Sequence, residues 1–261
     1  MIELYHWEPN LFYLKPLIAL HEKGIPFASH WIDPTALGSA GLPELSPEAR
    51  NNPEINGPIL VDRGETIVES FFMLEYIDEA YPTEPMLLPG DPLGNWQVRV
   101  WGRFLGERTA PAISTLGCHR YLARGFNGWS QTDIDAALAR FPRLEERNAW
   151  APVFRDSYGE EELAESRRKA TDAVNRVEAA LAGGEWLLGE RYTLADIEAF
   201  ALFNPLPELA PDLCSGAVAP RTTEWLFRMR QRPAVKAALA HSKSGLPTAA
   251  FAPGPEHARW G

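Results

Sequence analysis

The chain has 261 residues, of which 45% are hydrophobic and 23% charged, a composition typical of a folded globular protein. Its 35 acidic and 25 basic residues give a formal net charge of -10, which argues against nucleic acid or an anionic membrane surface as the main partner. Only Cys118 and Cys214 are present, and their wide separation indicates neither a disulfide framework nor a zinc site. The sequence has no signal-peptide pattern and no apolar run near the roughly 20 residues that span a bilayer, so we expect a cytoplasmic protein.

The first 32 residues predict a strand, a helix and a second strand. Ile2 to His6 has the apolar content of a strand, and Leu14 to Lys23 has helical spacing of apolar residues and ends at Gly24. Phe27 to Ile32 predicts the second strand.

A proline turn precedes the next predicted strand. Asn56, Gly57 and Pro58 stand immediately before the short apolar run Ile59 to Val61. Because proline cannot donate to a ladder, the backbone of Gly57 is free to turn outward, and we expect a cis bond before Pro58. A ligand backbone could pair with this exposed edge. The alternative is a plain turn without a binding role.

The segment after this strand predicts a hairpin and a helix. Asp62 to Glu65 has the residues of a tight turn, Thr66 to Val68 predicts a strand, and Glu69 and Ser70 begin a helix that runs to about Ala80. A helix N-terminus with unpaired amides and one carboxylate therefore lies beside the proline turn. The alternative is that Glu69 and Ser70 only cap the helix.

A proline-rich stretch between Tyr81 and Pro92 marks a domain boundary, because its residues break both helix and strand. Beyond it the periodicity predicts helices over Trp96–Leu105, Asp133–Phe141, Glu160–Gly183, Leu194–Phe203 and Thr222–Lys243. We expect a loose tail after Gly245, where periodicity ends. Thr193 and Asp196 form a capping box, so Asp196 is interpreted as structural.

The order strand, helix, strand, proline strand, turn, strand, helix is thioredoxin-like, and with the Glu-Ser pair it resembles the glutathione S-transferases. The resemblance implies an α+β fold: an N-terminal thioredoxin-like βαβ-ββα domain followed by an all-α helical domain. We expect a glutathione-binding domain over 1–82, a linker over 83–93, a substrate-binding helical domain over 94–245 and a tail over 246–261. It further implies that Asn56, Gly57, Pro58, Glu69 and Ser70 bind glutathione. In many members the tail lies over the substrate pocket, which would make Phe251 and Trp260 covering residues.

Glutathione reacts through its thiolate, and a free thiol with a pKa near 8.5 is only slightly ionised at neutral pH. A hydrogen-bond donor just before Leu14, at the start of the first helix, would favour the thiolate. In the family's Ser, Thr and Cys classes the activating residue lies five positions ahead of a basic residue, which maps from Lys15 to Asn10. An amide donates to a thiolate but forms no mixed disulfide. Tyr13 is the other candidate, although Phe12 and Tyr13 could equally pack the domain interface.

A closer resemblance runs along most of the chain, including Leu14 to Leu17 and Ile113 to Gly117. It is to the bacterial lignin β-aryl etherases, in the fungal-type branch, which are glutathione transferases. The resemblance also implies a long joint with many charged and aromatic residues between the middle helices, here over 141–159. The resemblance implies attack of the glutathione thiolate on a carbon that bears an aryloxy group beside a ketone, with release of a phenol and without a metal.

An aromatic cleft would suit this aromatic ether substrate. The candidate pocket residues come from both parts of the chain: Trp7, Phe12, Ile113, Leu116, Cys118, His119 and Tyr121. The alternative for each is a place in the core. Two other functions stay open: a general detoxifying transferase for electrophilic aromatics, or a partner subunit with little activity alone, since Asn10 lacks a hydroxyl. We expect a homodimer or a heterodimer with a related chain, as in the family.

Overall fold

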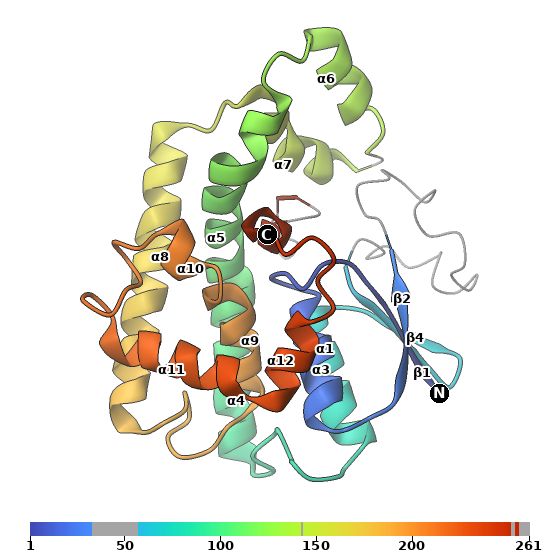
Figure 1. The fold of residues 1–261 in the computed structure, drawn as a ribbon, viewed down its shortest axis with the longest axis vertical. Helices are drawn as coiled ribbons and strands as arrows, with labels where there is room; N and C mark the ends of the chain where they lie inside the picture. Colours follow the sequence, from blue (N-terminus) through green and yellow to red (C-terminus); the bar gives the residue numbers. More distant parts are fainter. Residues whose placement is uncertain (33–56, 142, 252–253, 256–261) are drawn as a thin grey trace.

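The computed structural model describes residues 1–32, 57–141, 143–251 and 254–255. A small sheet with two helices against one face lies beside a larger helical part (Figure 1). This arrangement confirms the expected fold class, a thioredoxin-like unit followed by helices. The bounds 1–82, 83–93, 94–245 and 246–261 stay a proposal for the domain limits. Within the part of the chain described, no helix is long and apolar enough to cross a membrane.

The sheet has the strand order β2-β1-β3-β4. Its strands are β1 (Ile2–His6), β2 (Phe27–Trp31), β3 (Ile59–Asp62) and β4 (Glu65–Ile67). β1 pairs with β2 in parallel and with β3 antiparallel, and β3 pairs with β4 antiparallel. Each predicted strand is confirmed to within one residue at either end.

The β3–β4 hairpin closes through two residues with positive φ, Arg63 at 54° and Gly64 at 85°. A two-residue turn of this hand matches the right-handed twist of the strands that it joins. Asp62 and Glu65 consequently pair directly across the turn.

Helices α1 (Leu14–Glu22) and α3 (Ser70–Ala80) lie between the sheet and the helical part (Figure 1). Every residue of α1 from Leu14 to Leu20 is buried, because the helix is packed by α3 and by α9 (Leu194–Phe203) and α12 (Pro233–Leu239). A helix covered all round is apolar all round, with charged side chains admitted only when they are paired. Lys15 is such a side chain, and it becomes central to the site.

The remaining helices follow from α4 onward. The α-helices are α4 (Pro92–Phe104), α5 (Ala110–Gly117), α6 (Gln131–Leu138), α7 (Leu144–Arg155), α8 (Glu160–Ala180), α10 (Leu206–Leu209) and α11 (Pro220–Gln231). Short turns of π or 3-10 helix lie at η2 (Leu105–Thr109), η3 (Cys118–Leu122), η4 (Ala123–Phe126), η5 (Leu181–Gly183) and η6 (Pro247–Phe251).

Two expectations for the helical part were wrong. The joint expected over 141–159 contains α7, because aromatic residues four positions apart, Trp150 and Phe154, share one face and pack on Phe141. The single helix expected over Thr222–Lys243 is broken at Arg232, whose extended ψ of 133° is the conformation that a following proline imposes.

The segment between α3 and α4 is fastened to α1 by a buried lysine. Lys23 Nζ donates to Asp78 Oδ1 at 2.7 Å and to the carbonyls of Thr83 and Pro85 at 2.6 and 3.1 Å. The two oxygens of Asp78 also accept the backbone N–H groups of Leu87 and Leu88, at 2.9 and 2.8 Å. We call Lys23, Asp78 and their partners the linker network.

The capping box at the start of α9 is confirmed. Thr193 N–H donates to Asp196 Oδ2 at 3.0 Å, and Asp196 Oδ1 accepts from Leu187 N–H and from the indole of Trp225. Burial raises the pKa of Asp196 to about 6, although the hydrogen bonds from these donors act to lower it. Asp196 is therefore structural, as expected.

Candidate functional site

The loop between β1 and α1, residues 7–13, begins the candidate site, and we call it the site loop. Asn10 is buried, and its Oδ1 accepts the backbone N–H groups of Phe12 and Tyr13, both at 3.0 Å. The side chain thereby satisfies two backbone donors of the turn that leads into α1. Among the described residues, the amide nitrogen of Asn10 has no hydrogen-bond partner, so it keeps its donors for another group.

The two candidates for thiolate stabilisation differ in their surroundings. The Tyr13 side chain is 0% exposed and packs with Tyr5, Ile32 and Ile59 on the sheet. Tyr13 therefore has a packing role, against the sheet rather than at the domain interface that the alternative named. Asn10 has a donor available at the start of α1, so the geometry favours Asn10 as the group beside a thiolate.

The N-terminus of α3 carries the predicted Glu-Ser pair. Glu69 has φ 65° and ψ 105°, a backbone conformation that L-residues rarely adopt and that proteins keep mostly at functional sites. Ser70 is the first residue of the helix and is buried. Among the described residues the amides of the first turn of α3 have no hydrogen-bond partner, and they lie at the same end of the helix as the strained residue, as an anion site requires.

The proline turn differs from expectation. Asn56 lies outside the described residues, whereas Gly57 and Pro58 are described and precede β3. Among the described residues the cis peptide bond lies at Glu84–Pro85, so the cis bond expected before Pro58 is wrong. A trans proline already supplies the fixed φ and missing donor that a strand start needs, and X-Pro bonds favour trans by about 0.5–1 kcal/mol.

A second buried lysine connects α1, α3 and α9. Lys15 Nζ donates to Glu198 Oε1 at 2.7 Å and to Ser70 Oγ at 3.3 Å, and it lies 5.3 Å from the centre of the Phe12 ring. The Lys15 and Glu198 side chains are 2% and 1% exposed. We call Lys15, Glu198 and Ser70 the site network, because it joins the α3 N-terminus to the site loop.

His6 supports the start of the site loop. Its Nδ1 bonds the carbonyl of Trp7 at 2.8 Å and its Nε2 bonds Ser29 Oγ at 2.7 Å, so Nδ1 carries the proton and donates while Nε2 accepts. Burial lowers the pKa of His6 to about 4, which keeps the imidazole neutral at pH 7.

The site loop is also tied to the C-terminal segment through Glu8, a contact we call the Glu8 clamp. The carboxylate of Glu8 accepts from Ser242 Oγ at 2.6 Å and from the backbone N–H groups of Lys243 and Ser244 at 3.1 and 2.9 Å. The residue is 4% exposed. The C-terminal segment therefore begins beside the loop that carries Asn10.

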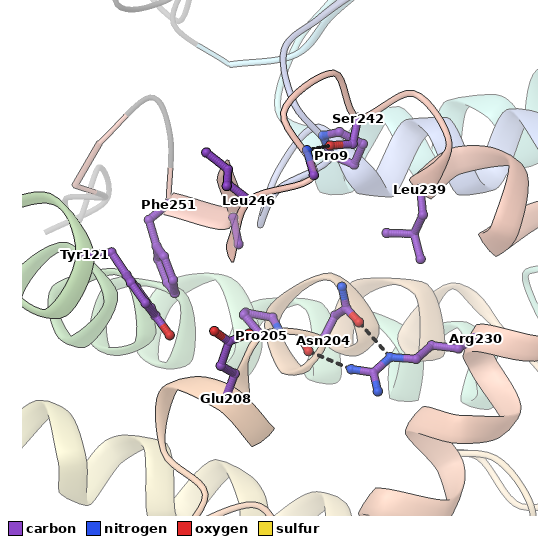
Figure 2. A pocket seen from close by; sticks show the side chains of 12 residues that line it. Pro9, Tyr121, Asn204, Pro205, Glu208, Arg230, Leu239, Ser242, Leu246 and Phe251 are labelled. Carbon is purple, nitrogen blue, oxygen red and sulfur yellow. Dashed lines mark hydrogen bonds between the residues drawn. The ribbon is translucent and has the colours of Figure 1, made fainter. Parts of the chain in front are cut away.

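A cavity of about 300 Å³ lies between the C-terminal segment and η3, α10, α11 and α12. Figure 2 shows Phe251 and Tyr121 stacked on one side of it, with their ring centres 5.4 Å apart, and Arg230 bonded to Asn204 on the other. Its lining consists of Pro9, Tyr121, Asn204, Pro205, Glu208, Arg230, Leu239, Ser242, Gly245, Leu246, Ala250 and Phe251. Pro9 brings the cavity next to Asn10.

The C-terminal segment is more ordered than a loose tail. Phe251 is 2% exposed and lies where a side chain on Gly117 would stand, 2.0 Å from a Cβ built there. The expectation of a loose tail was therefore wrong for 247–251, because a glycine leaves room for an aromatic ring. Trp260 lies outside the described residues.

The predicted substrate-pocket residues divide into two groups. Tyr121 lines the cavity, and Trp7 and Phe12 lie partly buried in the site loop, with Trp7 packed on Trp31 at 4.8 Å. The others lie elsewhere: Ile113 is 0% exposed in the core, Leu116 packs against that core, and His119 is exposed with its ring against Tyr158.

Cys118 is also buried in the core, and burial raises the pKa of its thiol to about 12. A protonated thiol in this position is not a nucleophile. Both cysteines are free. In the described ranges, no group of three or more His, Cys, Asp or Glu side chains is placed to hold a metal ion.

Several residues of the site were missed by sequence reasoning. Glu8, Glu198 and Arg230 were not singled out, and Lys15 served only as a position marker. A signal existed for two of them, because Lys15 and Glu198 stand among the buried apolar residues of α1 and α9. A charge in such a run predicts a buried partner, without saying which.

The fold and the site loop define a class of protein. Residues 11–80 match the family model of the glutathione S-transferase N-terminal domain, and residues 143–233 match that of the C-terminal domain. The chain belongs to the glutathione S-transferase superfamily.

Among its relatives, the protein LigF of Sphingobium sp. (strain NBRC 103272 / SYK-6) is 28% identical over 247 residues, 93% of this chain and 94% of LigF. The crystal structure of β-etherase LigF from this strain has a TM-score of 0.81 at 27% identity and covers 92% of this chain and 99% of that one. Glutathione S-transferase U25 of Arabidopsis thaliana is 33% identical over 100 residues, 38% of this chain and 42% of the plant protein. A glutathione S-transferase of Methylobacterium radiotolerans, solved with glutathione sulfonate, shares the fold at 23% identity, with a TM-score of 0.64 over 91% of this chain and 94% of that one.

Proposed function

We propose that the chain is a glutathione transferase of the β-etherase type, which uses the glutathione thiolate to displace a phenol from the β-carbon of a lignin-derived aryl ether ketone. The observation that carries the proposal is the likeness to β-etherase LigF, which extends over 93% of the chain and both of its parts. The local geometry supports the binding of glutathione: Asn10 has an amide donor without a partner among the described residues, and the helix start at Ser70 suits an anion, on elements joined by Lys15.

In the proposed binding mode, Glu69 and Ser70 hold the γ-glutamyl end and the backbone of Gly57 pairs with the cysteinyl backbone. The Asn10 amide donates to the sulfur. Each unit by which the thiol pKa falls corresponds to about 1.4 kcal/mol of preference for the thiolate, which one or two such donors supply.

The proposed chemistry is a displacement at carbon. The thiolate forms a C–S bond at the carbon beside the ketone as the C–O bond to the aryloxy group breaks. The electron pair leaves with the phenoxide, which takes up a proton. The adjacent carbonyl activates the carbon, so the protein's main tasks are to orient the two reactants and to lower the thiol pKa.

The test is to incubate the purified protein with reduced glutathione and an aryl ether ketone whose leaving phenol is fluorescent. Release that requires both protein and glutathione is the expected result. A protein that binds glutathione but releases no phenol would contradict the β-etherase assignment while leaving glutathione binding intact.

A general transferase for electrophilic aromatics is the second candidate, because the matched family models describe glutathione S-transferases without an ether substrate. A panel of aromatic electrophiles, with the ether as one member, separates the two. A clear preference for the ether supports the first proposal, and broad turnover without ether cleavage supports the second.

The third candidate is a partner subunit of a heterodimer, favoured by the absence of a hydroxyl at Asn10 and by the burial of Tyr13. We propose a dimer as in the family, with either identical subunits or a related chain. Activity of the chain alone, compared with activity beside a co-expressed homologue, tests this candidate.

A further inference from the structure

The site network contains the hydroxyl group of Ser70, whose proton is not used in the contact with Lys15. Lysine has three N–H donors and no acceptor, so in the 3.3 Å contact between Lys15 Nζ and Ser70 Oγ the serine oxygen must accept. The Ser70 proton then has to donate elsewhere. Among the described residues no acceptor for it is present. Ser70 therefore offers a donor at the N-terminus of α3.

We infer that Lys15 is a positioning residue, which orients the Ser70 hydroxyl as a donor toward the α-carboxylate at the γ-glutamyl end of glutathione. This inference rests on the proposed function. A carboxylate is the acceptor that fits, since the hydroxyl, the first-turn amides of α3 and the charge of Lys15 all favour a negative group there.

Glu198 balances this charge from the helical part of the chain. Its Oε1 accepts from Lys15 at 2.7 Å, while its Oε2 is buried without a hydrogen-bond partner among the described residues. A carboxylate used only to build structure would have both oxygens satisfied, because an unpaired buried acceptor costs free energy. Glu198 thus serves as the counter-ion of Lys15 when no ligand carboxylate is bound.

The arrangement makes Glu198 and the ligand carboxylate competitors for one buried positive charge. Removing the lysine charge should weaken glutathione binding, and removing the glutamate charge should strengthen it. Residues that merely hold the fold together would both weaken binding when replaced, so the opposite signs identify the positioning role.

The experiment compares two ligands by isothermal titration calorimetry at pH 7: glutathione, and the analogue in which γ-aminobutyrate replaces the γ-glutamyl residue and so lacks only the α-carboxylate. Lys15→Met should weaken glutathione about tenfold and the analogue less than about twofold. Glu198→Gln, which keeps shape and an acceptor oxygen, should tighten glutathione about threefold and leave the analogue unchanged.

Lys23→Met is the matched control, since Lys23 is the other buried lysine of this region and belongs to the linker network. It should lower the melting temperature without changing the ratio of the two affinities. If Lys15→Met does not fold, the affinities of Glu198→Gln for the two ligands test the inference on their own.

Two results would overturn the inference and leave the proposed function intact. One is an equal loss of affinity for both ligands in Lys15→Met. The other is unchanged or weaker glutathione binding in Glu198→Gln. A wild-type chain that binds neither ligand would overturn the proposed function together with it. Binding of glutathione with opposite effects of the two variants supports both.

Discussion

Two buried lysines close to the sheet have different surroundings. Lys23 in the linker network meets a carboxylate and two carbonyls, and both oxygens of Asp78 are satisfied by protein donors. Lys15 in the site network meets one oxygen of Glu198, a serine and an aromatic ring. Among the described residues the first network is complete, whereas the second leaves the Ser70 hydroxyl proton, one N–H of Lys15 and Glu198 Oε2 without a hydrogen-bond partner. Complete networks fix structure, and incomplete ones mark places where a ligand is expected.

The largest expected effect is on the free energy of unfolding, and it distinguishes the linker network from the site network. Asp78→Ala leaves Lys23 buried without a partner and removes the acceptor for two linker amides, which should cost about 3–5 kcal/mol in the free energy of unfolding. Denaturant unfolding measures this cost. Asp78→Asn, which keeps an acceptor oxygen, is the milder control. A loss below about 1 kcal/mol in the alanine variant would contradict the closed network.

Ser70→Ala should produce the opposite profile, a loss of binding with little loss of stability. A hydrogen bond to a charged group contributes about 1.5–3 kcal/mol, so glutathione affinity should fall by at least tenfold. Calorimetry and thermal unfolding of the same sample give both quantities. Ser70→Thr, which keeps the hydroxyl, is the matched control. A large drop in melting temperature with unchanged affinity would contradict the assignment of Ser70 to the site.

Low pH should also affect the two regions differently, because the buried imidazole of His6 lies at the start of the site loop. Burial lowers the folded pKa of His6 to about 4 from 6.5, so the folded state resists the proton. Its contribution to stability is present above pH 6.5 and is lost as pH falls toward 4. Linkage gives a loss of roughly 2 kcal/mol between pH 7 and pH 5.

The measurement compares denaturant unfolding of the wild type and of His6→Gln at these two pH values. The wild type should lose more stability than the variant on acidification. Equal losses would show that His6 is not the group responsible.

The smallest expected effect distinguishes two roles of the Asn10 side chain: its oxygen accepts from the backbone, and its amide is proposed to donate to the thiolate. Asn10→Asp keeps the oxygen that accepts from Phe12 and Tyr13 but loses the amide donor and adds a negative charge, so the pH profile of kcat/KM should move up by about one unit. Asn10→Ala should in addition lose about 1 kcal/mol of stability. An unchanged profile in the aspartate variant would transfer the thiolate donor to another group.

The sheet and its hairpin were predictable because their signals are local. Alternating apolar residues, the Arg63-Gly64 turn and the capping box at Thr193 each act within a few positions. The helix α7 was missed because its apolar face consists of aromatic residues among many charges, and the break at Arg232 was missed although Pro233 announced it.

The site was less predictable because its contacts are distant in sequence. Lys15 and Glu198 are 183 positions apart, and no local pattern pairs them. The ordered packing of Phe251 likewise depends on a distant residue, because its ring fills the space where Gly117 lacks a side chain. What the sequence did predict is the position of the helix starts at Leu14 and Ser70, since the signals for a helix start are local.

The Glu8 clamp has a consequence for the order in which this protein acquires its parts. Glu8 and Ser242 are separated by 234 residues, so at 5–20 residues per second the ribosome adds Ser242 roughly 10 to 50 s after Glu8. The strands of the sheet are all made well before that time. The loop that carries Asn10 gains its tie only when the helical part is nearly complete, so the candidate site is finished long after the strands of the sheet have been made.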